Sequence, residues 1–124
     1  MEVTPDAPVF FTGHSLGGAL ATLAAVEARL QMPTVKVSLY TFGCPRVFSK
    51  GMSNVVDQLL PRCFRVVVDG DIVAGVPVFG YRHVGTLAII DPLGNAVINP
   101  SFVEKVSTVC SVDMKGEQGR FIVG

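Results

Sequence analysis

The sequence predicts an α/β fold in which helices flank a parallel sheet. Three segments, at residues 9–12, 35–42 and 63–68, have the apolar, β-branched and aromatic composition of strands. Two segments between them, at residues 16–31 and 51–60, have the composition and apolar spacing of helices. Because alternating strands and helices are joined by right-handed crossovers, this order predicts parallel strands.

The composition is that of one folded domain. The chain has 124 residues, of which 49% are hydrophobic and 16% are charged. Ten basic and ten acidic residues cancel, so no basic surface points to nucleic acid or to an anionic membrane. The three cysteines, Cys44, Cys63 and Cys110, lack metal-site spacing, and we expect them to be small buried residues. We expect no metal and no organic cofactor.

The first strand and the first helix are both strongly apolar. Residues 9–12 are nearly all apolar, which is typical of a strand buried on both faces. Residues 16–31 carry apolar side chains over a broad surface, which predicts a helix packed in the interior, and Pro33 ends it.

The turn between them carries the most specific motif. Residues 13–17 fit Gly-x-Ser-x-Gly, the nucleophile elbow of α/β-hydrolases, in which a strained turn exposes the serine hydroxyl. A Cβ atom at Gly13 or Gly17 is expected to collide with the neighbouring strand or helix. The N–H of Leu16 is the expected oxyanion donor. In the alternative interpretation Ser15 only caps the helix, which leaves the two flanking glycines unexplained.

Polar loops follow each of the three strands. Ser15 follows the first, residues 43–46 follow the second, and residues 69–71 follow the third. Because the carboxyl ends of parallel strands meet at one edge of the sheet, we expect these loops to converge there.

The C-terminal part predicts a β-hairpin. Residues 81–90 lead into a strand, residues 91–95 have turn composition, and residues 96–98 can return as the second strand. A short helix is expected at residues 101–112.

Four stretches in order resemble the fungal-type, class 3 lipase family. They are the elbow at residues 13–21, Thr-Phe-Gly-x-Pro-Arg-Val at 41–47, the acidic loop at 65–77, and Tyr-x-His-x-Gly at 81–85. The resemblance implies an α/β-hydrolase fold and a Ser-His-Asp hydrolase of acyl esters. It makes Ser15 the nucleophile, Asp71 the acid that orients the histidine, and Leu16 an oxyanion donor.

Three features of the family have no counterpart in this sequence. The family places its lid and second oxyanion donor upstream of the elbow, and its catalytic histidine near the end of the domain. Residues 1–124 are therefore expected to form a partial class 3 lipase-like domain, a fragment without the upstream strands, the lid and the distal histidine.

The chain has only two histidines, His14 and His83. The order Ser15, Asp71, His83 allows His83 to be the base, whereas the resemblance implies a structural, hydrogen-bonded residue. We expect His14 to be a packed elbow residue that points away from Ser15.

The sequence thus predicts a serine ester hydrolase of acylglycerols or related lipids, inactive as this isolated chain. The alternative is a non-catalytic lipase-like domain that binds lipid or a protein partner. Transient contact with a lipid interface is expected. Arg46 is expected to fix a loop, and Asp57 to lie on a solvated helix face.

No apolar run approaches the about 18 residues of a membrane span, and the first residues do not form a signal peptide. This slightly favours a cytoplasmic or organellar location.

Overall fold

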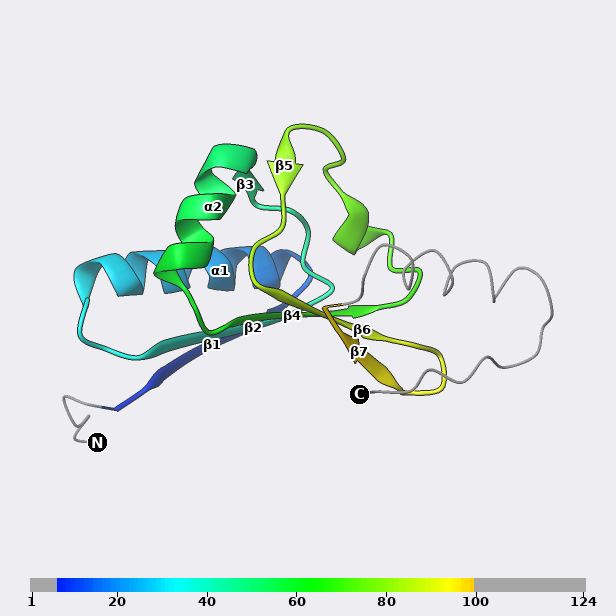
Figure 1. Cartoon of the computed structure of the whole chain (residues 1–124), viewed down its shortest axis with the longest axis horizontal. Helices are drawn as coiled ribbons and strands as arrows, with labels where there is room; N and C mark the ends of the chain where they lie inside the picture. The colour runs from blue at the N-terminus through cyan, green and yellow to red at the C-terminus, as the bar shows by residue number, and fades with distance from the viewer. Residues whose placement is uncertain (1–6, 100–124) are drawn as a thin grey trace.

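A five-stranded sheet with two helices on one face forms the framework of the protein (Figure 1). The computed structural model describes residues 7–99. Its elements in chain order are β1 (Val9–His14), α1 (Leu16–Gln31), β2 (Val37–Phe42), β3 (Phe48–Ser49), α2 (Lys50–Leu59), β4 (Cys63–Val68), the 3₁₀ turn η1 (Val73–Gly75), β5 (Tyr81–Arg82), β6 (Thr86–Ile90) and β7 (Ala96–Ile98).

The sheet has the order β1-β2-β4-β6-β7. Its first four strands are parallel, and β7 returns antiparallel to β6, so the predicted parallel sheet and C-terminal hairpin are confirmed. The predicted helix at residues 101–112 lies outside the described residues.

A second pair of strands, β3 and β5, was not predicted. These strands have two residues each and pair antiparallel beside α2. Two residues are too few to show a strand period, so no pattern in the sequence marks them.

The predicted helices are present with nearly the predicted bounds. The first has the predicted bounds, whereas α2 begins and ends one residue earlier than predicted. Both helices lie on the same side of the sheet (Figure 1). None of the helices in residues 7–99 has the length and apolarity needed to cross a membrane.

On the opposite face of the sheet, the side chains of β1 are exposed among the described residues, so the expectation that the first strand is buried on both faces is wrong. Side chains of β1 alternate between half-buried and exposed, and Phe10 is 63% exposed. On this face Tyr40 stacks between two phenylalanines, with ring centroids 6.5 Å from Phe10 and 5.3 Å from Phe64. In the described residues, the helices cover only the other face.

The expectation that α1 is packed in the interior is also wrong. Its buried residues are mostly small, namely Gly18, Thr22, Ala25 and Val26, and they include those that face the sheet. Its leucines are exposed, among them Leu20 at 60%. Small side chains let the helix axis approach the strands closely, and this places the bulkier leucines on the outer side.

The hydrophobic core lies between the sheet and the two helices. Leu39 of β2, Ala25 of α1 and Val56 of α2 are completely buried there. Because these three elements meet in one core, the carboxyl ends of the parallel strands are held on a rigid support.

Candidate active site

Ser15 forms a strained turn between β1 and α1. Its backbone has φ 53° and ψ −126°, a conformation that costs a residue with a side chain about 1–3 kcal/mol. Three hydrogen bonds hold it: the Ser15 N–H donates to the carbonyl of Phe42 at 2.9 Å, and the Ser15 carbonyl accepts from Gly18 at 2.9 Å and Ala19 at 3.3 Å. The strained geometry expected of an elbow is therefore present.

The side chain of Ser15 does not cap the helix. Ser15 occupies the residue before α1, but its hydroxyl makes no capping hydrogen bond. An N-cap serine normally adopts extended backbone angles and accepts from the first turn. The interpretation of Ser15 as a cap accounts for neither its φ nor its free hydroxyl.

Three nearby glycines have different surroundings. A Cβ atom at Gly13 would lie 2.2 Å from the carbonyl oxygen of Gly17, so the expected collision is confirmed there. At Gly17 the expectation is wrong, because nothing lies within 4 Å of an added Cβ. The tight contact is one residue later, where a Cβ at Gly18 would lie 2.9 Å from the Cβ of Cys44.

The N–H of Leu16, the expected oxyanion donor, lies at the first position of α1. At this position amide groups lack partners within the helix. Within residues 7–99, no backbone or side-chain acceptor pairs with this N–H. The helix dipole adds positive potential at the same place.

The three predicted loops converge at the edge of the sheet. The Ser15 N–H binds the end of β2, and the N–H of Gly43 donates to the carbonyl of Val66 in β4 at 2.9 Å. A Cβ atom on Gly43, which has φ 57°, would lie 2.6 Å from Oδ2 of Asp71 and 3.8 Å from Nε2 of His14. Only glycine therefore allows the carboxylate of Asp71 to lie this close to the loop after β2.

The carboxylate of Asp71 is oriented by its own turn. Its Oδ1 accepts the N–H of Val73 at 2.9 Å, and the Asp71 N–H donates to the carbonyl of Val68 at 3.0 Å. Oδ2, on the Gly43 side, has no hydrogen-bond donor among the described residues. This leaves one oxygen available to a partner.

The side chain of His83 is hydrogen-bonded to the loop that follows Asp71. Its Nε2 lies 2.6 Å from the carbonyl oxygen of Ala74, which can only accept, so Nε2 carries the proton. Burial and the neighbouring Arg65 and Arg46 guanidinium groups lower the pKa of His83 to about 4, and the Ala74 hydrogen bond only partly offsets this. Hydrogen bonding to a loop carbonyl is the structural arrangement that the resemblance implied.

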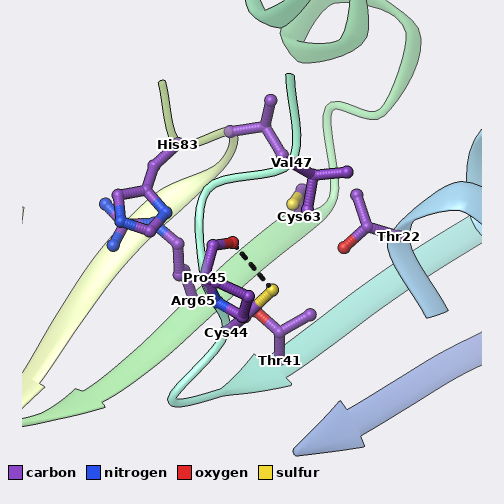
Figure 2. A pocket seen from close by; sticks show the side chains of 9 residues that line it. Thr22, Thr41, Cys44, Pro45, Val47, Cys63, Arg65 and His83 are labelled. Atoms are coloured by element: carbon purple, nitrogen blue, oxygen red, sulfur yellow. Dashed lines mark hydrogen bonds between the residues drawn. The ribbon is translucent and has the colours of Figure 1, made fainter. Parts of the chain in front are cut away.

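Figure 2 shows His83 and Arg65 together in the wall of a small cavity. Its volume is about 10 Å³, the size of one water molecule, which is too small for a lipid ester. The Nε atom of Arg65 is buried without an acceptor among the described residues. This cavity is a packing feature behind the site.

Cys44 and Cys63 line the same cavity as free, buried thiols. Burial raises the pKa of both thiols, that of Cys63 to about 12. Cys110 lies outside the described residues. In residues 7–99 no cluster of His, Cys, Asp and Glu side chains could hold a metal ion.

Two charged residues outside the expected triad have defined contacts. Arg46 donates to the carbonyls of Gly75 and Pro77, so its expected loop-fixing role is confirmed. Asp57 lies on the exposed face of α2, as expected, and its Oδ1 also accepts the N–H of Gly85 at 2.7 Å, which links α2 to the loop before β6. The residues around Asp57 in the sequence do not indicate that its partner is a backbone N–H in a distant loop.

Curated relatives match the region that contains these residues. The chain is 49% identical over 72 residues to lipase ZK262.3 of Caenorhabditis elegans, covering 56% of this chain and 20% of the relative. It is 47% identical over 74 residues to secreted mono- and diacylglycerol lipase 1 of Fusarium solani, covering 58% and 22%. The chain thus spans about a fifth of the length of these two relatives.

Solved structures match the fold. A lipase from Rhizopus microsporus var. chinensis superposes with a TM-score of 0.73 at 37% identity, covering 85% of this chain and 40% of that one. A triacylglycerol lipase described as having a serine protease triad at its catalytic centre gives a TM-score of 0.70 at 35% identity, covering 76% and 38%.

The family model for class 3 lipases matches residues 1–81, which contain the elbow, the loop after β2 and the acidic loop. The sheet is accordingly part of an α/β-hydrolase fold, and the chain belongs to the class 3 lipase family.

Proposed function

We propose that this chain supplies the nucleophile and the acid of a serine hydrolase that cleaves carboxylic esters of acylglycerols or related lipids. The observation that carries the proposal is the strained Ser15, whose hydroxyl does not cap the helix and whose neighbour Leu16 has an N–H with no acceptor among the described residues. The names of relatives as mono- and diacylglycerol lipases support the lipid ester as substrate.

The reaction proceeds through an acyl-serine. A histidine removes the proton from Ser15 Oγ as this oxygen attacks the ester carbonyl, and the N–H of Leu16 donates to the oxyanion. The histidine returns the proton to the departing alcohol. Water then cleaves the acyl-Ser15 ester by the reverse sequence of proton transfers. The free Oδ2 of Asp71 orients the histidine and stabilises its charged form.

The base in this proposal comes from outside the 124 residues. His83 donates Nε2–H to Ala74, so that nitrogen is not free to accept a proton from Ser15. The chain has no histidine after position 83. We therefore expect negligible turnover of a nitrophenyl ester by the isolated chain, since absence of an oxyanion donor alone costs about 10²-fold or more.

The test is covalent labelling with a fluorophosphonate, which reacts with activated serines. We expect the protein isolated from its native source to be labelled, with the modified peptide containing Ser15. A recombinant Ser15→Ala protein from the same complete gene is the control. Absence of labelling in the folded native protein would contradict the catalytic proposal.

The second candidate is a non-catalytic domain that binds lipid or a protein partner. One observation that motivates it is the hydrogen bond of His83 to Ala74, which leaves that histidine unable to act as the base. The other is an exposed apolar segment directly after Asp71, where Ile72 is 82% exposed and Phe79 is 90% exposed. Co-sedimentation with phosphatidylcholine vesicles tests lipid contact by this segment. Binding that is lost in Ile72→Ser/Phe79→Ser but retained in Leu30→Ser supports it, and equal binding of all three proteins contradicts it.

A further inference from the structure

Four consecutive carbonyl groups, at residues 74–77, lie in the second half of η1 and directly after it, and two residues bind all of them. The carbonyl of Ala74 accepts from Nε2 of His83 at 2.6 Å, and that of Val76 accepts from the backbone N–H of Arg46 at 2.8 Å. Nη1 of Arg46 donates to the carbonyl of Gly75 and, at 2.9 Å, to that of Pro77. Loop carbonyls usually bind water, so this arrangement is a specific restraint on residues 74–77.

The restraint originates in the loop that faces Asp71. Gly43 and Arg46 belong to the same short segment after β2, and Gly43 is the residue beside Oδ2 of Asp71. One end of this segment therefore sets the space for the carboxylate, while the other end holds the backbone a few residues downstream. Because guanidinium N–H groups have fixed directions, Arg46 specifies an orientation as well as a distance.

His83 completes the restraint without adding charge. It lies close enough to Arg65 and Arg46 for both guanidinium groups to disfavour its protonation, and it is therefore a neutral donor at neutral pH. The Ala74 carbonyl that it binds belongs to η1, whose first residue, Val73, donates its N–H to Oδ1 of Asp71. The backbone of η1 thus joins the residue that binds His83 to the residue that binds the carboxylate.

We propose that Arg46 is a positioning residue, which fixes the backbone at residues 74–77 and thereby aims the carboxylate of Asp71 at the base. This inference rests on the proposed function for its catalytic consequence, but the positioning itself can be measured without activity. Arg46 does not touch the reacting atoms in this scheme and acts only through the acidic loop.

Amide hydrogen exchange measured by NMR on the 124-residue chain tests the positioning. The N–H of Val73 reports on the carboxylate, because Oδ1 of Asp71 is its acceptor. In Arg46→Gln we expect this amide to exchange about tenfold faster or more, the effect of losing hydrogen bonds from a charged donor. The exchange rates of amides in β1 and β2 should be the same as in the wild type. Arg46→Lys should protect the Val73 amide better than Arg46→Gln does.

Arg62→Gln is the matched control, since Arg62 is exposed at the amino end of β4 and its side chain makes no hydrogen bond within the described residues. Arg62→Gln should leave the exchange rate of the Val73 amide unchanged. Unchanged exchange at Val73 in folded Arg46→Gln, or equal acceleration of every amide, would overturn the proposal. If Arg46→Gln does not fold, Arg46→Lys decides by the same criterion, with faster exchange at Val73 supporting the proposal and unchanged exchange overturning it.

Ester hydrolysis by the protein expressed from its complete gene tests the catalytic consequence. There Arg46→Gln should lower kcat by about tenfold to a hundredfold with KM nearly unchanged, because misplacing the acid affects the transition state more than binding. An unchanged kcat overturns the catalytic consequence. A wild-type protein without any activity would instead refute the proposed function, and the exchange at Val73 would still decide whether Arg46 positions the carboxylate.

Discussion

Gly13 and Gly17 flank Ser15 symmetrically in the sequence, but only the first has no room for a side chain. We expect Gly13→Ala to lower the free energy of unfolding by about 3 kcal/mol or more, because the clash is with backbone that cannot move aside. Gly17→Ala adds a methyl group to open space in a helix and should stabilise by about 0.5 kcal/mol. Urea unfolding of the two variants measures these changes. Equal changes in the free energy of unfolding would contradict the predicted difference between the two glycines.

His83 makes stability depend on pH. Its pKa is lowered to about 4 in the folded protein from 6.5 in the unfolded chain, so the unfolded state binds more protons between these values. The contribution is fully present above pH 6.5 and is lost as the pH falls toward 4. The urea midpoint should therefore decrease from pH 7 to pH 4.5.

In His83→Gln this decrease should be smaller. The hydrogen bonds of Asp91 lower the pKa of that carboxyl below 3.8, so its titration falls below this window. A His83→Gln protein with the full decrease would show that other groups are responsible.

At the scale of single residues, the strained Ser15 and the crowding at Gly13 could be predicted because both belong to a spaced motif. The contacts of Arg46 with Gly75 and Pro77 and of Asp57 with Gly85 could not be predicted in detail. Every residue has a carbonyl, and nearly every residue has an N–H, so no residue type identifies the partner.

The β6–β7 hairpin depends on one carboxylate. Oδ1 of Asp91 accepts the N–H groups of Leu93 and Asn95 at 2.9 and 2.8 Å, and Oδ2 accepts from Nδ2 of Asn95 at 2.8 Å. We expect Asp91→Ala to open the turn and to accelerate amide exchange in β7, with less effect in Asp91→Asn, which keeps an acceptor oxygen. Equal exchange in the wild type and Asp91→Ala would contradict this.

The elements that could be predicted are those with enough residues to show a pattern. The bounds of α1 and β4 follow from their composition and from proline, whereas β3 and β5 are too short. The exposed face of α1 could not be predicted, because a helix that is apolar on several sides does not show which side meets the sheet. In this fold the small residues, including Gly18 and Ala25, meet it.

The exposed sheet face should limit the solubility of the isolated chain. Phe10, Tyr40 and Phe64 form a stacked row there, and β1 pairs only with β2 among the described strands, which leaves its other edge open. We expect light scattering to increase with concentration, and Phe10→Lys/Phe64→Lys to reduce the increase. Leu30→Lys on the helical side is the control, and an equal reduction there would contradict a role for this face.

For the whole molecule, the order of the strands was enough to predict that the three loops meet at one edge. That prediction needs only the parallel arrangement and the crossovers, which repeat in every such sheet. We could not predict which faces of the sheet are covered by helices. This depends on which segments pack against each face and not on the strands themselves.

The hydrogen bond from Ser15 to Phe42 also bears on the order of events during synthesis. The backbone restraints on Ser15 come from residues 13–19 and from the end of β2. Because a polypeptide leaves the ribosome from its N-terminus, a nascent chain can complete the kinked serine once β2 has emerged. The segments that restrain the nucleophile therefore leave the ribosome before the acid does, because every backbone contact of Ser15 lies in the part of the chain that ends with β2.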